Sequence, residues 1–126
     1  VYETTLGEAT KLAIDVVAPI NGPGDRTGCQ FLGDGVVKTP KGYKEAWDQF
    51  RAGGWISPSA DPELGGAGMP YAIAVVLQEL FSGAGMAFIM YPGLTAAAGR
   101  VIHKFGLERW RNTVAQKLFS GEWGGT

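Results

Sequence analysis

A long uncharged segment, Leu80–Gly99, limits the possible folds of this sequence more than any other part. Its length approaches the roughly 20 mainly apolar residues that a membrane-spanning helix requires. However, the helix breakers Gly83, Gly85, Pro92 and Gly93 interrupt it. These interruptions favour a buried helix or a pair of helices in a globular protein, and we expect no membrane span.

The first helix is predicted over residues 4–18, because their apolar side chains recur at intervals of three and four residues. Thr5 and Glu8 have the spacing of a capping box, in which each side chain satisfies a free N–H at the helix start. Pro19 is expected to end this helix. Its apolar face comprises Leu6, Ala9, Leu12, Ala13, Val16 and Val17.

A second helix is predicted over residues 39–54, with Thr39 as its N-cap. We expect Gly53 or Gly54 to end it in the left-handed conformation. The residues that share its apolar face are Tyr43, Ala46, Trp47 and Phe50.

Three more helices are predicted over residues of about 70–82, 86–105 and 107–120, with a bend or split at Pro92–Gly93. The inner face of the last one would carry Leu107, Trp110, Val114 and Leu118.

Two glycine- and proline-rich segments, residues 21–38 and 55–69, are predicted as long loops, with a short extended piece at Val36–Val37. No segment has a convincing strand pattern. The sequence therefore predicts an all-α domain over residues 1–126, with about five helices and two long loops.

The charge and the reactive side chains exclude several classes of function. The chain has 11 basic and 12 acidic residues, so its formal charge of −1 gives no electrostatic support for binding nucleic acid. One histidine, His103, and one cysteine, Cys29, do not make a metal-ligand set. We interpret His103 as a residue at a helix end and Cys29 as an inert thiol, and we expect a reducing, cytoplasmic location.

The stretch "DPELGGAGMP", residues 61–70, is the only candidate phosphate cradle. Its glycines lack the spacing of the dinucleotide-binding fingerprint, no strand precedes them, and no Lys-Ser/Thr pair follows. We interpret it as a structural loop before a helix that starts at Pro70.

The segment "MAFIMYPGLTAAAG", residues 86–99, mixes bulky and very small residues on one apolar helix. Helix packing is the favoured explanation, and an apolar ligand tunnel is the alternative. The acidic residues are scattered, and we identify no acid/base pair among them.

Three segments, taken in their order along the chain, form a recognisable pattern. These are "GGWISPSADPELGGAGMP", "LQELFSGAGMAFIMYPGLTAAAGRVIHKFG" and "KLFSGEWGGT". Together they resemble the N-terminal helical domain of the flavin-dependent acyl-CoA dehydrogenases. The front segment, "DRTGCQF…DGVVKTPKGYKEAWDQF", is similar to the subgroup that includes 3-(methylthio)propanoyl-CoA dehydrogenase.

This resemblance implies a larger parent protein with a middle β domain and a C-terminal helical bundle. It implies FAD as cofactor, an acyl-CoA substrate, an electron-transfer partner and a homo-oligomer, in fatty acid metabolism. A glutamate in the C-terminal part would remove the α proton, and the β hydride would pass to the flavin to give a 2-enoyl-CoA.

The sequence starts at Val1 and stops after "SGEWGGT", so we interpret it as a piece of a longer polypeptide. The family's flavin-contacting Thr-Glu-Pro motif would begin just after Thr126, and the catalytic glutamate would lie much further on. We therefore expect no catalytic residue in this chain, no tight FAD binding and no turnover by the chain alone.

The resemblance also implies that the helix over residues 86–105 lines the acyl-chain pocket. Phe88 and Tyr91 would then limit the length of the acyl chain, because their rings fill volume that a longer chain needs. Carried over by position, the pocket residues are Ala87, Phe88, Tyr91 and Thr95, with Met90 and Leu94 as further candidates.

Two alternatives remain open at this point. The chain could be a non-enzymatic helical interaction module, or it could share the fold but belong to an acyl-CoA oxidase or a DNA-damage-response relative.

Overall fold

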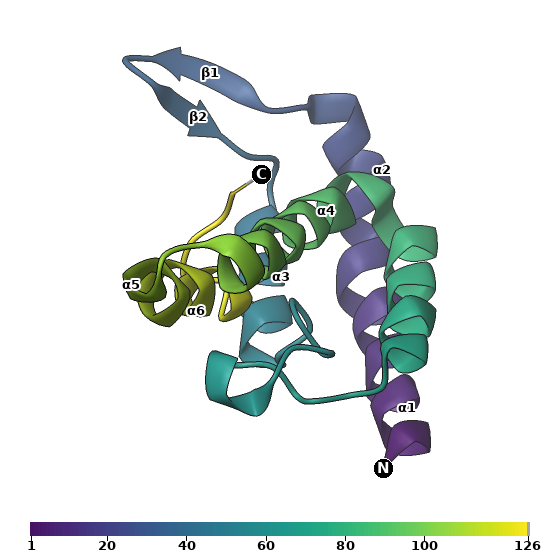
Figure 1. The fold of residues 1–126 in the computed structure, drawn as a ribbon. Coiled ribbons are helices and arrows are strands. Elements are labelled where there is room, and N and C mark those ends of the chain that lie inside the picture. Colours follow the sequence, from purple (N-terminus) through teal and green to yellow (C-terminus); the bar gives the residue numbers. More distant parts are fainter. Residues whose placement is uncertain (126) are drawn as a thin grey trace.

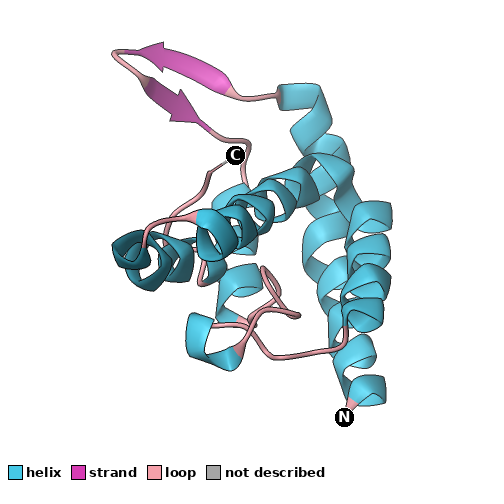
Figure 2. Cartoon of the chain, in the orientation of Figure 1, coloured by secondary structure: helices cyan, strands magenta, loops and turns pink. Residues whose placement is uncertain are grey.

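The computed structural model of the chain describes residues 1–125, and most of them are helical (Figures 1 and 2). One β-hairpin projects from the helical body. Its strands are β1 (Gln30–Gly33) and β2 (Val36–Lys38). In chain order the helical elements are α1 (Tyr2–Leu12), the π-helical turn η1 (Ala13–Val17), α2 (Ala18–Thr27), α3 (Tyr43–Ala52), the 3₁₀ turn η2 (Pro62–Leu64), α4 (Tyr71–Phe105), α5 (Glu108–Trp110), the π-helical turn η3 (Arg111–Ala115) and α6 (Gln116–Phe119).

The predicted all-α class is confirmed, but the first helix is longer than expected. Elements α1, η1 and α2 follow one another without a gap, so the prediction that Pro19 ends the helix is wrong. In the π turn, the N–H of Ala18 donates to the carbonyl of Ala13. This wider turn shifts the hydrogen-bond register just before the proline, which then lies in the first turn of α2.

The predicted capping box is also wrong, because α1 begins at Tyr2 and already includes both of its residues. The Thr5 hydroxyl donates to the carbonyl of Val1 (3.1 Å). Glu8 instead accepts a hydrogen bond from Lys11 (2.7 Å). The predicted apolar face of this helix is confirmed: Ala9, Ala13 and Val17 are buried, and Leu6, Leu12 and Val16 pack against the core.

Residues 21–38 are not a loop, because they hold the end of α2 and the whole hairpin. The extended piece expected at Val36–Val37 belongs to β2, which pairs antiparallel with β1. Asp34 and Gly35 connect the strands with φ angles of 49° and 76°. Positive φ at both positions is typical of a type I′ hairpin turn, for which Asp-Gly is a preferred sequence. That dipeptide between apolar residues was the signal for a hairpin.

Helix α3 begins later than predicted, and Thr39 is not its N-cap. The N-cap is Gly42, with a φ of 90°. Pro40 is buried and its carbonyl accepts the N–H of Tyr43 (3.3 Å), so residues 39–42 form a turn against the core. The predicted left-handed glycine at the other end is confirmed at Gly54, with a φ of 73°.

Helix α4 changes direction at Gly85, where φ is −172° and ψ is 90°. This confirms the predicted boundary between helices over residues 70–82 and 86–105, whereas the further split predicted at Pro92–Gly93 is wrong, because the helix continues through both residues. We call residues 71–84 the first arm and residues 86–105 the second arm; Figure 1 shows the angle between them. A Cβ placed on Gly85 would lie 3.0 Å from Val17 and 3.6 Å from Asn21. The break therefore lies where α4 crosses η1 and α2 most closely.

The predicted last helix is confirmed as the succession of α5, η3 and α6, but only part of its predicted inner face is buried. Leu118 is buried and Val114 half-buried, whereas Leu107 and Trp110 are exposed. The π turn η3 (Arg111–Ala115) begins just after Trp110 and includes Val114. A π turn holds one more residue than an α-helical turn, so the helix faces before and after it point in different directions. A single helical period along the sequence therefore could not predict both buried faces.

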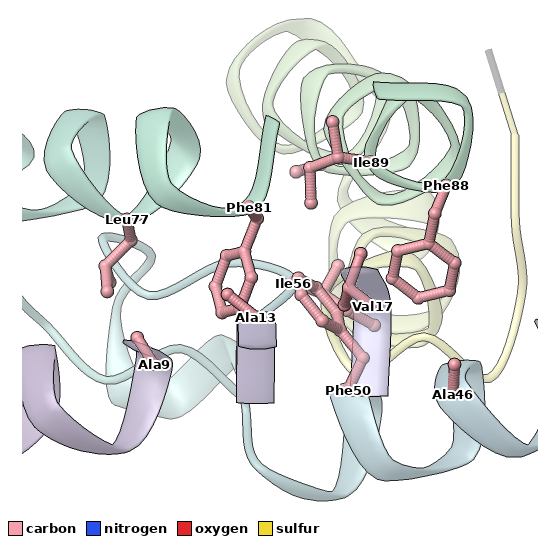
Figure 3. Close-up of a cluster of buried hydrophobic side chains, with 11 residues drawn as sticks. Ala9, Ala13, Val17, Ala46, Phe50, Ile56, Leu77, Phe81, Phe88 and Ile89 are labelled. Atoms are coloured by element: carbon pink, nitrogen blue, oxygen red, sulfur yellow. The ribbon is translucent and has the colours of Figure 1, made fainter. Parts of the chain in front are cut away.

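The core lies between the α1–α2 helix, α3 and the two arms of α4 (Figure 3). Phe50 of α3 is at its centre, with ring centroids 4.8 Å from Phe81 and 5.5 Å from Phe88. Phe50 thus makes edge-to-face aromatic contacts with both arms of α4, and such contacts stabilise a core beyond its buried area.

By length and composition alone, α4 could cross a membrane, since an 18-residue window has a mean hydropathy of 1.7. One such helix is weak evidence. The break at Gly85 and the buried face that packs on α3 fit a core helix of a globular protein better.

Candidate functional site

The four residues predicted to line a pocket all lie on the second arm of α4, but they do not share one surface. Phe88 and Thr95, which are seven residues apart, face inward and are 5% and 0% exposed. Ala87 and Tyr91 lie on the neighbouring face and are exposed. The structure therefore divides the predicted set into two buried and two accessible residues.

Tyr91 is held in place although it is half exposed. Its ring meets Trp47 of α3 edge-on, with centroids 4.7 Å apart. The backbone of Gly124 lies directly against the same ring, so that a side chain at that position would overlap it. Next to it, the N–H of Gly125 donates to the hydroxyl of Thr95 (3.3 Å). The last described residues thus run along the second arm and cover Thr95.

The accessible face of the second arm is apolar over most of its length, and we call it the α4 stripe. Its large side chains are between 44% and 73% exposed. Contiguous apolar surface of this kind is uncommon on a self-contained soluble protein and marks a contact with a ligand or another polypeptide. The α4 stripe comprises Met86, Ala87, Met90, Tyr91, Leu94, Val101 and Phe105.

A cleft of about 320 Å³ lies on the other side of the second arm, between the two arms and residues 55–59. None of the four predicted pocket residues borders it. Most of its lining residues are apolar, but Ser57, Gln78 and Arg100 add polar groups, and its surface is about as polar as it is apolar. The main apolar lining residues are Trp55, Phe81, Ile89, Pro92, Gly93 and Ala96.

Sequence reasoning missed this cleft because it depends on how the two arms of α4 pack against residues 55–59. The boundary between the arms was predicted, but the angle at which they meet is not a local property of the sequence. The spacing of Ile89, Pro92 and Ala96 at three and four residues was the available signal for one lining face.

Two buried polar atoms near these surfaces have no hydrogen-bond partner in the described part of the chain. They are the hydroxyl of Ser57, a residue that is 3% exposed, and Nδ1 of His103. His103 lies in the last turn of α4, as predicted for a residue at a helix end.

The Gly-rich loop at residues 61–70 does not present its N–H groups to a ligand. Gly66 donates to the carbonyl of Asp61 (3.1 Å), and Gly68 donates to that of Ala60 (2.9 Å). The backbone of Gly66 also packs directly on Ala60. Because these donors are used within the loop, it does not fit the phosphates of FAD, and the interpretation as a structural loop is supported.

The charged side chains offer no metal centre among residues 1–125, where no three His, Cys, Asp or Glu residues lie close enough to hold an ion. The ion pairs found there are on the surface and link near neighbours in sequence. In one of them, the hydrogen bond and charge of Glu8 raise the pKa of Lys11 above its ordinary value. Such exposed pairs contribute little to stability.

Residues 34–122 match the family described as "Acyl-CoA dehydrogenase, N-terminal domain". The chain belongs to the acyl-CoA dehydrogenase family. The matched region contains α3, both arms of α4 and the last helical succession, so the resemblance inferred from the sequence is confirmed.

Two proteins named as acyl-CoA dehydrogenases are similar to almost the whole chain. The 3-methylmercaptopropionyl-CoA dehydrogenase of Ruegeria pomeroyi is 35% identical over 121 residues, which is 96% of this chain and 20% of that protein. The butyryl-CoA dehydrogenase of Syntrophomonas wolfei is 33% identical over 118 residues, or 92% of this chain and 19% of that protein. The chain therefore spans about a fifth of the length of these relatives.

Proposed function

We propose that this chain is the N-terminal helical domain of a flavin-dependent acyl-CoA dehydrogenase, which oxidises an acyl-CoA to a 2-enoyl-CoA. The observation that carries the proposal is the family match over residues 34–122, together with two relatives that are named as acyl-CoA dehydrogenases. The helical fold of the described residues is consistent with it.

The proposal gives this domain a binding role rather than a chemical one. The glutamate that removes the α proton and the residues that hold FAD belong to the remainder of the parent, where the flavin accepts the β hydride. The glycine N–H groups of the Gly-rich loop donate to carbonyls within the loop or next to it, so they are not directed at the cofactor's phosphates. What the domain supplies is an apolar helix surface that excludes water from the acyl chain and limits its length.

We assign that surface to the second arm of α4, with Ala87, Phe88, Tyr91 and Thr95 as its pocket residues. Ala87 and Tyr91 would contact the acyl chain, since they are exposed on the α4 stripe. Phe88 and Thr95 would fix the position of the arm from behind, since both are buried. The edge-on contact with Trp47 keeps the Tyr91 ring from rotating away, so the ring can close the end of the acyl-chain pocket.

The cleft on the opposite side of the same arm is a second candidate for holding the acyl chain. Its volume of about 320 Å³ and its mostly apolar lining residues favour it. Two variants of the parent separate the surfaces. Gly93→Leu would fill the cleft, because a Cβ on Gly93 meets only Gln78, at 3.9 Å. If Gly93→Leu abolishes oxidation of long acyl chains while Tyr91→Ala changes nothing, the assignment to the α4 stripe is wrong.

The remaining parts of the proposal follow the family. We expect the parent to be a cytoplasmic homo-oligomer in fatty acid metabolism, with an electron-transfer partner that reoxidises the flavin. Anaerobic mixing of the parent with a panel of acyl-CoA thioesters should bleach the flavin absorbance. A non-enzymatic interaction module would give no bleaching, and an acyl-CoA oxidase would be reoxidised rapidly by oxygen after bleaching.

A further inference from the structure

The β1–β2 hairpin is the least covered part of the structure. It projects from the helical body (Figures 1 and 2), and almost all of its residues are exposed. Four large apolar side chains lie on it: Phe31 is 72% exposed, Leu32 62%, Val36 53% and Val37 56%. Because these side chains alternate along the strands, neither face of the hairpin is covered by the described part of the chain.

A hairpin with this composition is poorly suited to remain exposed to solvent on all sides. Two-stranded hairpins are marginally stable in water without a third strand or a packed face. Exposed strand edges are normally protected by charges or prolines. Within the two strands, however, the only charged residue is Lys38, at the end of β2. The hairpin therefore has the properties of an element that packs against another part of a protein.

Contacts at the base of the hairpin show which end of the molecule it occupies. The backbone of Gly24, near the end of α2, lies against the ring of Tyr43, which follows β2 at the start of α3. The Tyr43 ring centroid is 6.1 Å from that of Phe88 on the second arm. The base of the hairpin and the start of the α4 stripe are thus neighbours.

The last described residues reach the same end. Gly124 lies against Tyr91, one turn of helix after Phe88, and Gly125 is hydrogen-bonded to Thr95. The apolar hairpin, the start of the α4 stripe and the end of the described chain therefore meet in one region.

We propose that the hairpin is a docking arm for the remainder of the parent polypeptide, within the same subunit. The inference rests on the proposed function, in which this chain is one domain of a longer enzyme. Relatives of the chain are about five times its length, so most of such a polypeptide lies outside this domain. Gly124 lies against Tyr91, one helical turn from Phe88, whose ring meets that of Tyr43 after the hairpin, so the rest of the subunit can reach the hairpin without a long linker.

Hydrogen exchange in the full-length parent tests the inference directly. Followed by mass spectrometry, peptides covering residues 28–40 should exchange at least about tenfold more slowly than the same sequence unfolded, because docking protects a hairpin that is marginal alone. Exchange at the unfolded rate would show an uncovered hairpin and would overturn the proposal.

A matched pair of variants identifies what covers the hairpin. Phe31→Asp places a charge on the hairpin, and Ile14→Asp places one on α1–α2 at a side chain that is 62% exposed. We expect Phe31→Asp alone to lower the melting temperature of the parent and to speed exchange in a second segment beyond this domain. Equal behaviour of the two variants would contradict the proposal.

Two further readouts complete the test. If Phe31→Asp dissociates the oligomer in ultracentrifugation and leaves exchange beyond this domain unchanged, a second copy covers the hairpin and the proposal is wrong. Flavin bleaching by acyl-CoA is scored separately on the unmodified parent. A parent that protects the hairpin without bleaching would refute the proposed function and leave the docking arm standing.

Discussion

At the scale of single residues, neighbouring positions on the second arm of α4 have different roles. Phe88 is 5% exposed and packs on Phe50 and Tyr43, whereas Tyr91 is 50% exposed and packs edge-on against Trp47. Both were predicted as pocket residues because the family resemblance carries their positions over to this helix. Which of them is buried depends on where α3 crosses the arm, and that is not a local property of the sequence.

Tyr91→Ala in the parent enzyme should therefore shift substrate preference toward longer acyl chains. Removal of the ring frees volume on the α4 stripe, and each methylene in such a pocket is worth about 1–3 kcal/mol of discrimination. The measurement is kcat/KM over a series of acyl-CoA chain lengths. Tyr91→Phe keeps the ring and is the control, so it should retain the original profile. An unchanged profile in Tyr91→Ala would refute its place in the pocket wall.

The same variant at Phe88 would test stability instead. Truncation of a buried phenylalanine costs about 3–5 kcal/mol, so a loss of activity in Phe88→Ala would not distinguish a pocket role from a folding defect.

Gly66→Ala should destabilise the protein by about 1–3 kcal/mol, because the added methyl would overlap the backbone of Ala60 inside the loop. Gly7→Ala is the matched control. Gly7 lies in α1 with open space around it, so alanine there should stabilise by about 0.5–1 kcal/mol. Thermal unfolding of both variants measures the difference. If Gly66→Ala is as stable as Gly7→Ala, the backbone of Gly66 does not pack directly on Ala60.

At the scale of elements, helix types and most of the inward faces followed from the sequence, and several element boundaries did not. The faces of α1 and α3 were predicted because apolar periodicity directly reports burial. The continuation of the first helix past Pro19 was missed because the π turn η1 accommodates the proline. The break at Gly85 falls at the predicted boundary between two helices, but the further split predicted at Pro92–Gly93 is absent. The first error comes from a shift in hydrogen bonding that the local pattern does not report.

The packing of α4 on the last helix gives a prediction at this scale. A Cβ on Gly99 would overlap the ring of Phe119, whereas one on Gly93 would meet only Gln78, at 3.9 Å. Gly99→Ala should thus separate the two helices and cost about 1–3 kcal/mol, while Gly93→Ala should be neutral or stabilising. Urea unfolding of the two variants compares them. Equal stability of the two variants would mean that α4 and α6 are not in close contact at Gly99.

At the scale of the whole molecule, the chain exposes many large apolar side chains that its described elements do not cover. The α4 stripe and the hairpin together expose side chains such as Phe31, Val101 and Phe105, which are 72%, 59% and 73% exposed. The family resemblance implied one apolar contact surface, on the helix over residues 86–105 that is expected to line the acyl-chain pocket. The hairpin was not predicted as a second such surface, because that segment was interpreted as a loop.

The isolated chain should therefore self-associate. Exposed apolar patches that are covered in a larger protein promote association when that protein is removed. Sedimentation velocity over a range of concentrations measures this, with the full-length parent as the comparison. A chain that stays monomeric at all concentrations and unfolds only at high temperature would contradict the account of these surfaces.

The central claim is that this domain belongs to an enzyme that transfers electrons from an acyl-CoA to a flavin. The most direct measurement is anaerobic titration of the full-length parent with acyl-CoA thioesters of increasing chain length, followed by the absorbance of the bound flavin. We predict bleaching with at least one thioester, with a defined optimum of chain length. A parent that contains flavin but shows no bleaching with any thioester would contradict the claim.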